Sequence, residues 1–335
     1  HGVGVHMAQV VDVGDLLAAG VAAPGDEARA QGFFPLRQVL AHLVLSEKTY
    51  QRLGPAVNSG TSIFLYGPPG NGKTSIARAI GNLVQAQNIY IPYAVSVDGQ
   101  VIKLFDSVNH HLVPDEDTTN KGTGSLRSGT RRDPRWVRIR RPFIVTGGEL
   151  TLAMLDLGYN AASKVYDAPL QMKANNGILI IDDFGRQRVS PEELLNRWVV
   201  PLDRRVDFLT LAGGKKIEIP FDMLVVFATN LDPARLVDEA FLRRIQTKIK
   251  VDPLKPDQFR EVFMRLCLKH DLDYEPALAD ELIRIIVQER GEPLRACYPR
   301  DIVQQILWAA QYRRERPRLD RQAIEAACNN YFLAL

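Results

Sequence analysis

The chain has 335 residues, of which 46% are hydrophobic and 24% are charged, and its formal net charge is +3. This length suggests two domains, the composition is that of an ordinary globular protein, and so small a charge does not by itself imply a polyanionic partner. No apolar run reaches the roughly 18–20 residues that span a bilayer, and no basic-then-apolar leader is visible, so we expect a cytoplasmic protein. The three cysteines are widely spaced and fit reduced thiols better than a disulfide framework.

The first third of the chain indicates an N-terminal extension followed by alternating helices and strands. Residues 1–35 are rich in Ala, Gly and Val and predict a short extension, whose residues 1–6 resemble a vector-derived tail. The apolar rhythm of residues 36–53 favours a helix, and the Gly, Pro and polar residues of 54–60 favour a loop. The next elements are predicted in this order: a strand at Ser62–Tyr66, a helix at Thr74–Gln85 and a second strand at Ile89–Val97.

Residues 106–141 predict an inserted surface loop, because they hold Pro114, Pro134, several Gly and Thr, and a dense run of arginines. The arginine cluster comprises Arg127, Arg131, Arg132, Arg135, Arg138, Arg140 and Arg141, with Trp136 among them. These side chains could grip phosphates and stack a base, hold an acidic protein or a neighbouring subunit, or simply form a solvated loop. The sequence leaves these alternatives open.

The second half predicts a buried parallel sheet and then a helical region. Helices are expected at Gly148–Leu157, Ala161–Val165, Pro191–Pro201 and Leu236–Arg244, and strands at Gly177–Ile181, Leu224–Ala228 and Thr247–Val251. Two further strands, Asp207–Ala212 and Lys215–Phe221, flank a two-residue glycine turn and predict a hairpin. Residues 256–333 show four helical stretches and no clear strand. The expected fold is therefore α/β, a three-layer α/β/α parallel sheet over residues 36–252 followed by a small all-helical domain over 253–335.

A glycine-rich loop between the first of these strands and the helix after it carries the main chemical signal. It consists of Gly67, Pro68, Pro69, Gly70, Asn71, Gly72, Lys73 and Thr74, followed by Ser75. Glycines let the backbone N–H groups wrap around a phosphate, and the following helix offers its positive N-terminal end. Lys73 would reach the β- and γ-phosphates, and Thr74 would place its hydroxyl on Mg²⁺. The loop predicts a site for ATP and Mg²⁺.

A pair of carboxylates follows a buried strand about 110 residues downstream of the loop. Asp182 and Asp183 come directly after an apolar run that ends at Ile181. At the end of such a strand Asp182 would hold Mg²⁺, directly or through water, and Asp183 would orient and deprotonate the attacking water.

The loop and the carboxylates, with three further features, resemble the AAA+ family of ring-forming ATPases. The features are Asn230 at the end of Phe227-Ala228-Thr229-Asn230, the run Ala240-Phe241-Leu242-Arg243-Arg244, and Arg300 within Tyr298-Pro299-Arg300-Asp301. The resemblance implies that Asn230 is sensor 1, that Arg244, or else Arg243, is an arginine finger for the neighbouring subunit, and that Arg300 is sensor 2 and touches the nucleotide from a helical lid. It covers residues 36–333 and implies a homo-oligomeric ring, expected to be a hexamer.

One position departs from the family pattern. The family usually has Asp-Glu where this chain has Asp182-Asp183, so hydrolysis could be slower, or another carboxylate such as Glu149 could be the base. The leading interpretation is a Mg-ATP-driven, chaperone-like motor that remodels a protein or complex. The alternatives are a nucleic-acid motor or loader, acting through residues 127–141, and a nucleotide switch that hydrolyses ATP slowly.

Overall fold

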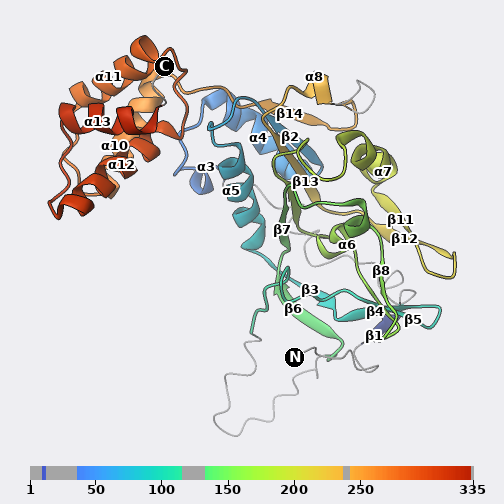
Figure 1. The fold of residues 1–335 in the computed structure, drawn as a ribbon. Coiled ribbons are helices and arrows are strands. Elements are labelled where there is room, and N and C mark those ends of the chain that lie inside the picture. The colour runs from blue at the N-terminus through green and yellow to red at the C-terminus, as the bar shows by residue number, and fades with distance from the viewer. Residues whose placement is uncertain (1–9, 13–35, 115–132, 237–241, 333–335) are drawn as a thin grey trace, which may run out of the picture.

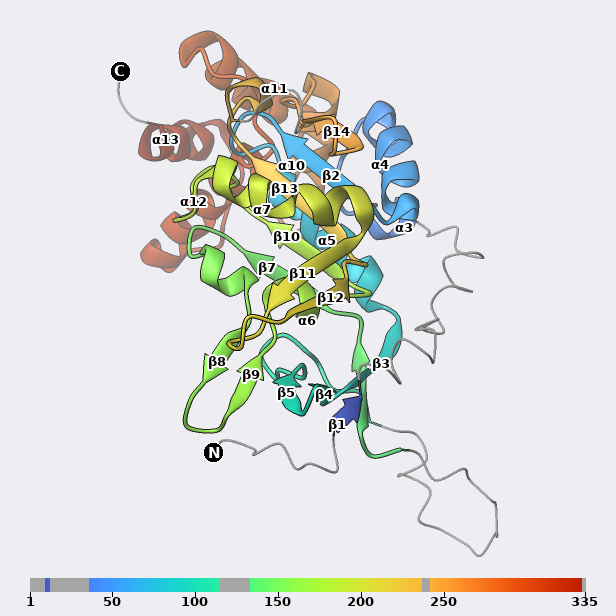
Figure 2. The same ribbon diagram turned by 90° about the vertical axis from the view of Figure 1, so that its right-hand side faces the viewer.

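The computed structural model describes residues 10–12, 36–114, 133–236 and 242–332. Its centre is a sheet of five parallel strands: β2 (Ser62–Tyr66), β7 (Phe143–Thr146), β10 (Ile178–Ile181), β13 (Leu224–Thr229) and β14 (Thr247–Lys250). Their spatial order is β14-β2-β13-β10-β7, so β2 and β10 lie on either side of β13 (Figure 2). Because all five strands run in one direction, the residues that follow β2, β10 and β13 meet at one edge of the sheet.

Helices cover both faces of this sheet. Alternate residues of a strand point to opposite faces, so Ile63 and Leu65 pack with α4 (Glu47–Ser59) and α5 (Lys73–Gln85), together with the short α3 (Leu36–Val39). Phe64, between them, packs on the other face with Trp198 of α7 (Pro191–Arg204). This face also holds the 3₁₀ helix η3 (Leu152–Leu155) and α6 (Leu170–Lys173). The predicted three-layer α/β/α arrangement is confirmed.

A second group of strands, which we call the accessory β region, lies at one end of the central sheet (Figures 1 and 2). It contains a sheet in the order β1 (Val10–Asp12), β4 (Ala94–Val97), β5 (Gln100–Lys103), β9 (Val165–Asp167) and β8 (Gly158–Asn160). It also contains an antiparallel ribbon of β3 (Asn88–Pro92) with β6 (Trp136–Arg140) and a hairpin of β11 (Val206–Thr210) with β12 (Lys216–Pro220). Leu209 and Ile217 of the hairpin share a buried cluster with Val95 and Ile102, so the hairpin packs on the accessory sheet.

A buried polar contact joins the accessory β region to α6. Asp106 pairs with Lys173 at 2.9 Å, and the buried His110 lies 2.9 Å from the Lys173 carbonyl oxygen through Nε2. Burial raises the pKa of Asp106, but hydrogen bonds from Lys173 and from the Val108 backbone N–H outweigh it and lower the pKa to about 2. The ionised carboxylate is therefore favoured by the fold.

The C-terminal part of the chain is helical and has its own core. It contains α10 (Pro256–Lys269), α11 (Pro276–Arg284) with a π turn, η4 (Ile285–Glu289), at its end, α12 (Tyr298–Arg313) and α13 (Arg321–Tyr331). Phe259, Phe263, Ile302 and Ile324 pack together there, apart from both clusters of the central sheet (Figure 1). The four predicted helices are confirmed. None of the helices in the described ranges is long and apolar enough to cross a membrane.

Several predicted elements are wrong. The run Ile89–Val97 is two strands in different sheets, β3 and β4. The proposed loop at 54–60 continues α4 as far as Ser59, with Gly60 as its C-cap. The predicted helices at 148–157 and 161–165 are replaced by η3 and by the antiparallel pair β8–β9. The glycine turn of the hairpin is longer than two residues, because β11 ends at Thr210 and β12 begins at Lys216.

The predicted surface loop at 106–141 is also partly wrong. Residues 136–140 form β6, whose Val137 and Ile139 are buried, and the chain then enters β7 of the central sheet. Residues 115–132, with Arg127, Arg131 and Arg132, lie outside the described residues. So does most of the predicted helix at Leu236–Arg244, of which α8 (Pro233–Leu236) covers only the first residue.

Candidate nucleotide site

The glycine-rich loop connects β2 to α5 and has a backbone that requires glycine. Gly67, Gly70 and Gly72 have φ values of 137°, 79° and 86°, which L-residues with a side chain rarely adopt. A methyl group on Gly67 would lie 2.4 Å from the Val251 carbonyl oxygen, so the loop passes directly against the end of β14. No side chain caps the N-terminus of α5, which begins at Lys73. Its first N–H groups are thus oriented to bind an anion.

Lys73 is held under the loop that precedes it. Its side chain is buried, and Nζ donates hydrogen bonds of 2.8 Å to the carbonyl oxygens of Gly67 and Pro68. Burial lowers the pKa of Lys73, and the charges of Asp183 and Asp182 oppose this effect. These two hydrogen bonds therefore hold the ammonium group beside the loop without the help of a ligand.

Thr74 and Asp182 place a hydroxyl and a carboxylate where they could hold a cation. The Thr74 hydroxyl donates to Asp182 Oδ1 at 3.0 Å, and the same oxygen accepts the Asp183 backbone N–H at 3.0 Å. No group of three or more His, Cys, Asp or Glu side chains that could hold a metal occurs among the described residues. A cation here would take one hydroxyl and one carboxylate from the protein and complete its shell with phosphate and water oxygens, as Mg²⁺ does.

Asp183 and Asn230 meet because β10 and β13 are neighbours. Asn230 Nδ2 donates to Asp183 Oδ1 at 3.3 Å, and both side chains line the same cavity. Asp183 has φ of 49°, a left-handed conformation that Asp tolerates better than most residues. The Gln187 side chain holds this turn by donating to the carbonyl oxygens of Asp182 and Asp183, at 2.9 and 3.1 Å.

Glu149, the other acidic candidate, is engaged with its own loop. Its Oε1 accepts hydrogen bonds from the Gly147 backbone N–H at 2.9 Å and from the Thr146 hydroxyl at 3.1 Å. The Gly147 N–H, more than any other group, lowers the pKa of this carboxyl. Glu149 is not among the residues that line the cavity, whereas Asp183 is.

A cavity of about 1020 Å³ extends from the phosphate-binding loop to the helical domain. Its lining includes Pro69 to Ser75, Asp182, Asp183, Asn230 and Arg300. The helical domain touches the loop directly, because the Cys297 backbone N–H at the start of α12 donates to the Gly70 carbonyl oxygen at 2.9 Å. Arg300 also lies in the first turns of α12, where Asp301 Oδ1 accepts from its Nε at 2.8 Å. The structure thus brings Arg300 to the cavity, as the sequence motif predicts.

Aliphatic side chains also line this cavity, and they were not predicted. They are Val44 and Leu45, which precede α4, and Leu254, Val262 and Leu266 of the C-terminal part, with the charged Lys48, Arg52 and Arg265 among them. Such a pocket suits the flat face of a nucleobase. Sequence reasoning could not find these residues, because aliphatic side chains that line a pocket have the same pattern as those that fill a core.

Arg243 and Arg244 lie away from the cavity. The Arg244 carbonyl oxygen accepts from the hydroxyl of Ser62, the first residue of β2, whereas the phosphate-binding loop follows the last residue of that strand. Arg244 Nε donates to Asp203 Oδ2 at 2.9 Å, and the Arg243 side chain is exposed. Neither arginine is near the nucleotide site of its own chain.

The described arginines of the 127–141 cluster do not form one patch. Arg141 is buried and donates to the Asn176 carbonyl oxygen at 2.7 Å. Arg135 is paired with Asp133 at 2.6 Å. Arg138 and Arg140 alternate with buried residues along β6. Part of the cluster therefore supports the accessory β region.

Comparisons with known proteins agree with this fold. Residues 63–115 match the family model of the ATPase family associated with various cellular activities (AAA), and residues 255–330 match a domain of unknown function, DUF8689. No curated protein sequence matches the chain. A mutant of RuvB from Thermotoga maritima has a similar structure, with 14% identity and a TM-score of 0.50 over 87% of this chain and 71% of that one.

NtrX from Brucella abortus, solved in complex with ADP, is similar at 13% identity and a TM-score of 0.50, over 90% of this chain and 58% of that one. At these identities the likeness concerns the fold: a parallel P-loop sheet with flanking helices and a helical C-terminal region. The family match covers β2, the phosphate-binding loop and α5, where the site begins. In this match and in its fold, the chain is similar to AAA+ ATPases.

Proposed function

We propose that this protein binds Mg-ATP, hydrolyses it, and acts as an oligomeric ring that remodels a protein or complex. One observation carries the ATPase assignment: Thr74, Asp182, Asp183 and Asn230 are joined by hydrogen bonds at one edge of the central sheet, within the cavity that Arg300 also lines. Three segments far apart in the sequence converge there on the side-chain set that phosphoryl transfer to water needs.

Each residue has a distinct part in this proposal. The loop Gly67–Ser75 and the Lys73 ammonium bind the phosphates, while Thr74 and Asp182 hold Mg²⁺, which would neutralise charge on the phosphate oxygens. Asp183 accepts the proton of the attacking water, and the Asn230 amide keeps that carboxylate and the water in place. Arg300 contacts the nucleotide from the helical lid.

The position of Arg243 and Arg244 supports the proposed ring. β2 has five residues, so its first and last residues are roughly 13 Å apart at about 3.3 Å per residue. An arginine near the start of β2 cannot reach the phosphates bound at its end, but it can serve the site of an adjacent subunit. Arg244 is our first choice and would exchange Asp203 for the neighbour's γ-phosphate; the exposed Arg243 is the second.

The direct test measures ATP hydrolysis by the purified chain and by Lys73→Ala. We expect turnover that requires Mg²⁺ and is lost in the variant together with nucleotide binding. Wild-type affinity and turnover in Lys73→Ala would show that the site is wrongly assigned. Stimulation by unfolded protein, compared with single- and double-stranded DNA, separates the protein remodeller from its alternatives.

A nucleic-acid motor is the second candidate. The observation that favours it is the surface of the helical domain where Arg314, Arg316 and Arg318 are exposed. A slow nucleotide switch is the third candidate, and it rests on Asp183, whose side chain is one methylene shorter than the Glu usual in the family.

A further inference from the structure

One surface of the helical domain combines exposed aromatic rings with exposed arginines. Trp308 and Tyr312 are 55% and 90% exposed, although α12 buries Ile302, Ile306 and Ala310 on its other side. The two rings are four residues apart and so lie on the same face of the helix. Large aromatic side chains normally bury most of their surface, so two of them left in solvent on one helix face need an explanation.

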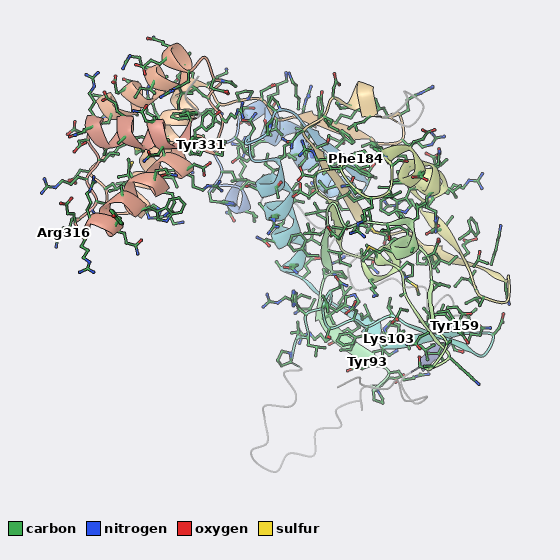
Figure 3. The ribbon with its side chains drawn as sticks, viewed as in Figure 1. Tyr93, Lys103, Tyr159, Phe184, Arg316 and Tyr331 are labelled. Atoms are coloured by element: carbon green, nitrogen blue, oxygen red, sulfur yellow. The ribbon has the colours of Figure 1, made fainter. Side chains whose placement is uncertain are left out.

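Four arginines follow these rings directly in the chain. Arg313, Arg314, Arg316 and Arg318 surround a single glutamate, Glu315, at the outer tip of the domain, where Figure 3 labels Arg316. Among the described residues, only Arg313 pairs with that glutamate. We call Trp308, Tyr312, Arg314, Arg316 and Arg318 the lid-tip surface.

Most other arginines of the helical domain are paired with carboxylates. Six of them, Arg260, Arg265, Arg284, Arg295, Arg300 and Arg321, each form an ion pair with a carboxylate. Arg314, Arg316 and Arg318 are exposed and have no ion pair with any residue that the structure describes. Three guanidinium groups are thus available to an anionic partner.

We propose that the lid-tip surface binds single-stranded nucleic acid. Bases stack on exposed Trp and Tyr rings, and planar guanidinium groups contact phosphates, which is the combination that single-strand-binding surfaces use. An acidic protein segment would use the charges but not the two rings. An amphipathic helix would need a groove with aliphatic walls, whereas this surface presents aromatic rings and guanidinium groups.

The same helix also reaches the nucleotide cavity. Arg300 lies in the first turn of α12 and Tyr312 in its last. A rigid helix of 16 residues spans about 24 Å, so a strand bound at the tip is mechanically connected to the lid side of the ATP site. The binding itself does not depend on hydrolysis, and it can be measured without ATP.

The test titrates the full chain with fluorescently labelled oligothymidylate and oligouridylate, and measures anisotropy and tryptophan emission at low salt without nucleotide. Trp198 is fully buried and Trp136 partly so, whereas Trp308 is exposed and should be quenched on binding. Trp308→Ala should lower the affinity by about 5- to 150-fold, the range for one stacked base. Trp308→Phe keeps a ring and should bind nearly as well, without the quenching.

The charge arm uses the triple variant Arg314→Gln, Arg316→Gln and Arg318→Gln. Its plot of log affinity against log salt should be less steep by about 2, which is three charges at roughly 0.7 each. The matched control replaces three paired arginines of the same domain with Gln, at Arg260, Arg284 and Arg321, and should change affinity little. Circular dichroism checks that each variant folds.

Three outcomes would overturn the proposal: no binding of either oligonucleotide at low salt, full binding by the triple variant, or equal competition by polyglutamate. The second would move the nucleic-acid contact elsewhere, and the third would show a general anion surface without stacking. Any of them can occur while ATP hydrolysis proceeds normally, so failure here is distinct from failure of the proposed ATPase function.

Discussion

The contact between Gly70 and Cys297 can be tested by building a methyl group into it. In Gly70→Ala the new Cβ would lie 2.7 Å from Cys297 Sγ, well inside the 3.5–4.0 Å at which non-bonded atoms attract best. The left-handed backbone costs an L-residue about 1–2 kcal/mol, and overpacking costs about 1–3 kcal/mol. We therefore expect Gly70→Ala to lose about 2–5 kcal/mol of unfolding free energy.

The chain offers a matched control at Gly72. This residue has φ of 86°, but its added Cβ would have no atom within 4 Å. Gly72→Ala should therefore lose only the backbone part, about 1–2 kcal/mol. Cys297→Ala removes the sulfur, so it should recover about 1–3 kcal/mol in Gly70→Ala and nothing in Gly72→Ala.

The assay is denaturant unfolding of the three single and two double variants, with nucleotide affinity measured in parallel. A displaced lid should also weaken nucleotide binding in Gly70→Ala, and Cys297→Ala should restore part of it. If Gly70→Ala and Cys297→Ala are additive within about 0.5 kcal/mol, then α12 does not rest on the phosphate-binding loop and the described lid contact is wrong.

Three further predictions concern the reaction, the ring and the acid stability of the fold. Asp183→Asn should still bind ATP but hydrolyse it more slowly by roughly 10²-fold or more. Unchanged turnover would mean that another group positions the water. Arg244→Ala and Lys73→Ala should each be inactive, because an arginine finger contributes about 10³-fold or more to the rate. Mixing the two variants should restore hydrolysis at interfaces where an intact Arg244 meets an intact Lys73 site. No recovery, with activity per subunit constant on dilution, argues for a monomer. Since the pKa of Asp106 falls from 3.8 to about 2 on folding, its stabilising effect is complete above pH 3.8 and is lost as the pH falls towards 2. Asp106→Asn should cost roughly 2 kcal/mol at neutral pH and make stability less pH-dependent in that window; a urea-unfolding series identical to wild type would contradict the Asp106–Lys173 contact.

The strand ends of the nucleotide site could be predicted because chemistry restricts them. A phosphate loop needs glycines at fixed positions, and Asp182 must end a strand that is buried on both faces. The apolar runs before Gly67, Asp182 and Asn230 therefore identify β2, β10 and β13 without any knowledge of the fold.

β7 was missed because its neighbours hide it. Phe143–Thr146 is a short apolar run between Pro142 and Gly147, but Arg138, Arg140 and Arg141 precede it and suggested a surface loop. The strand before it, β6, carries a period-two pattern in which Val137 and Ile139 are buried and arginines lie between them. The high charge of the whole segment concealed this strand pattern.

The two wrong helices failed for local and tertiary reasons. In the segment 161–165, the Asn160 side chain accepts the backbone N–H groups of Ala162 and Ser163, which favours a turn over a helix. In the segment 148–157, the Arg188 and Val189 N–H groups donate to the carbonyl oxygens of Gly148 and Leu150, contacts that no local pattern can predict.

Packing also overrode the breakers in α4. Gly54 and Pro55 suggest a loop, but Leu53, Ala56 and Val57 are buried against the sheet, and this burial outweighs a poor helix propensity. The interior proline removes one helical hydrogen bond without ending the helix.

The threading of the chain through its two sheets has a consequence for how the molecule folds. Strands of the accessory β region occur at 10–12, 88–103, 136–140, 158–167 and 206–220, and strands β2, β7 and β10 of the central sheet lie between them in the chain. Neither sheet can be completed from a contiguous stretch of sequence, so their contacts are of long range and must form late and together. The helices from 256 to 331, by contrast, pack mainly with one another and form contacts between neighbours in the chain. We expect this C-terminal unit to fold quickly, while the two sheets fold and unfold together in one cooperative step.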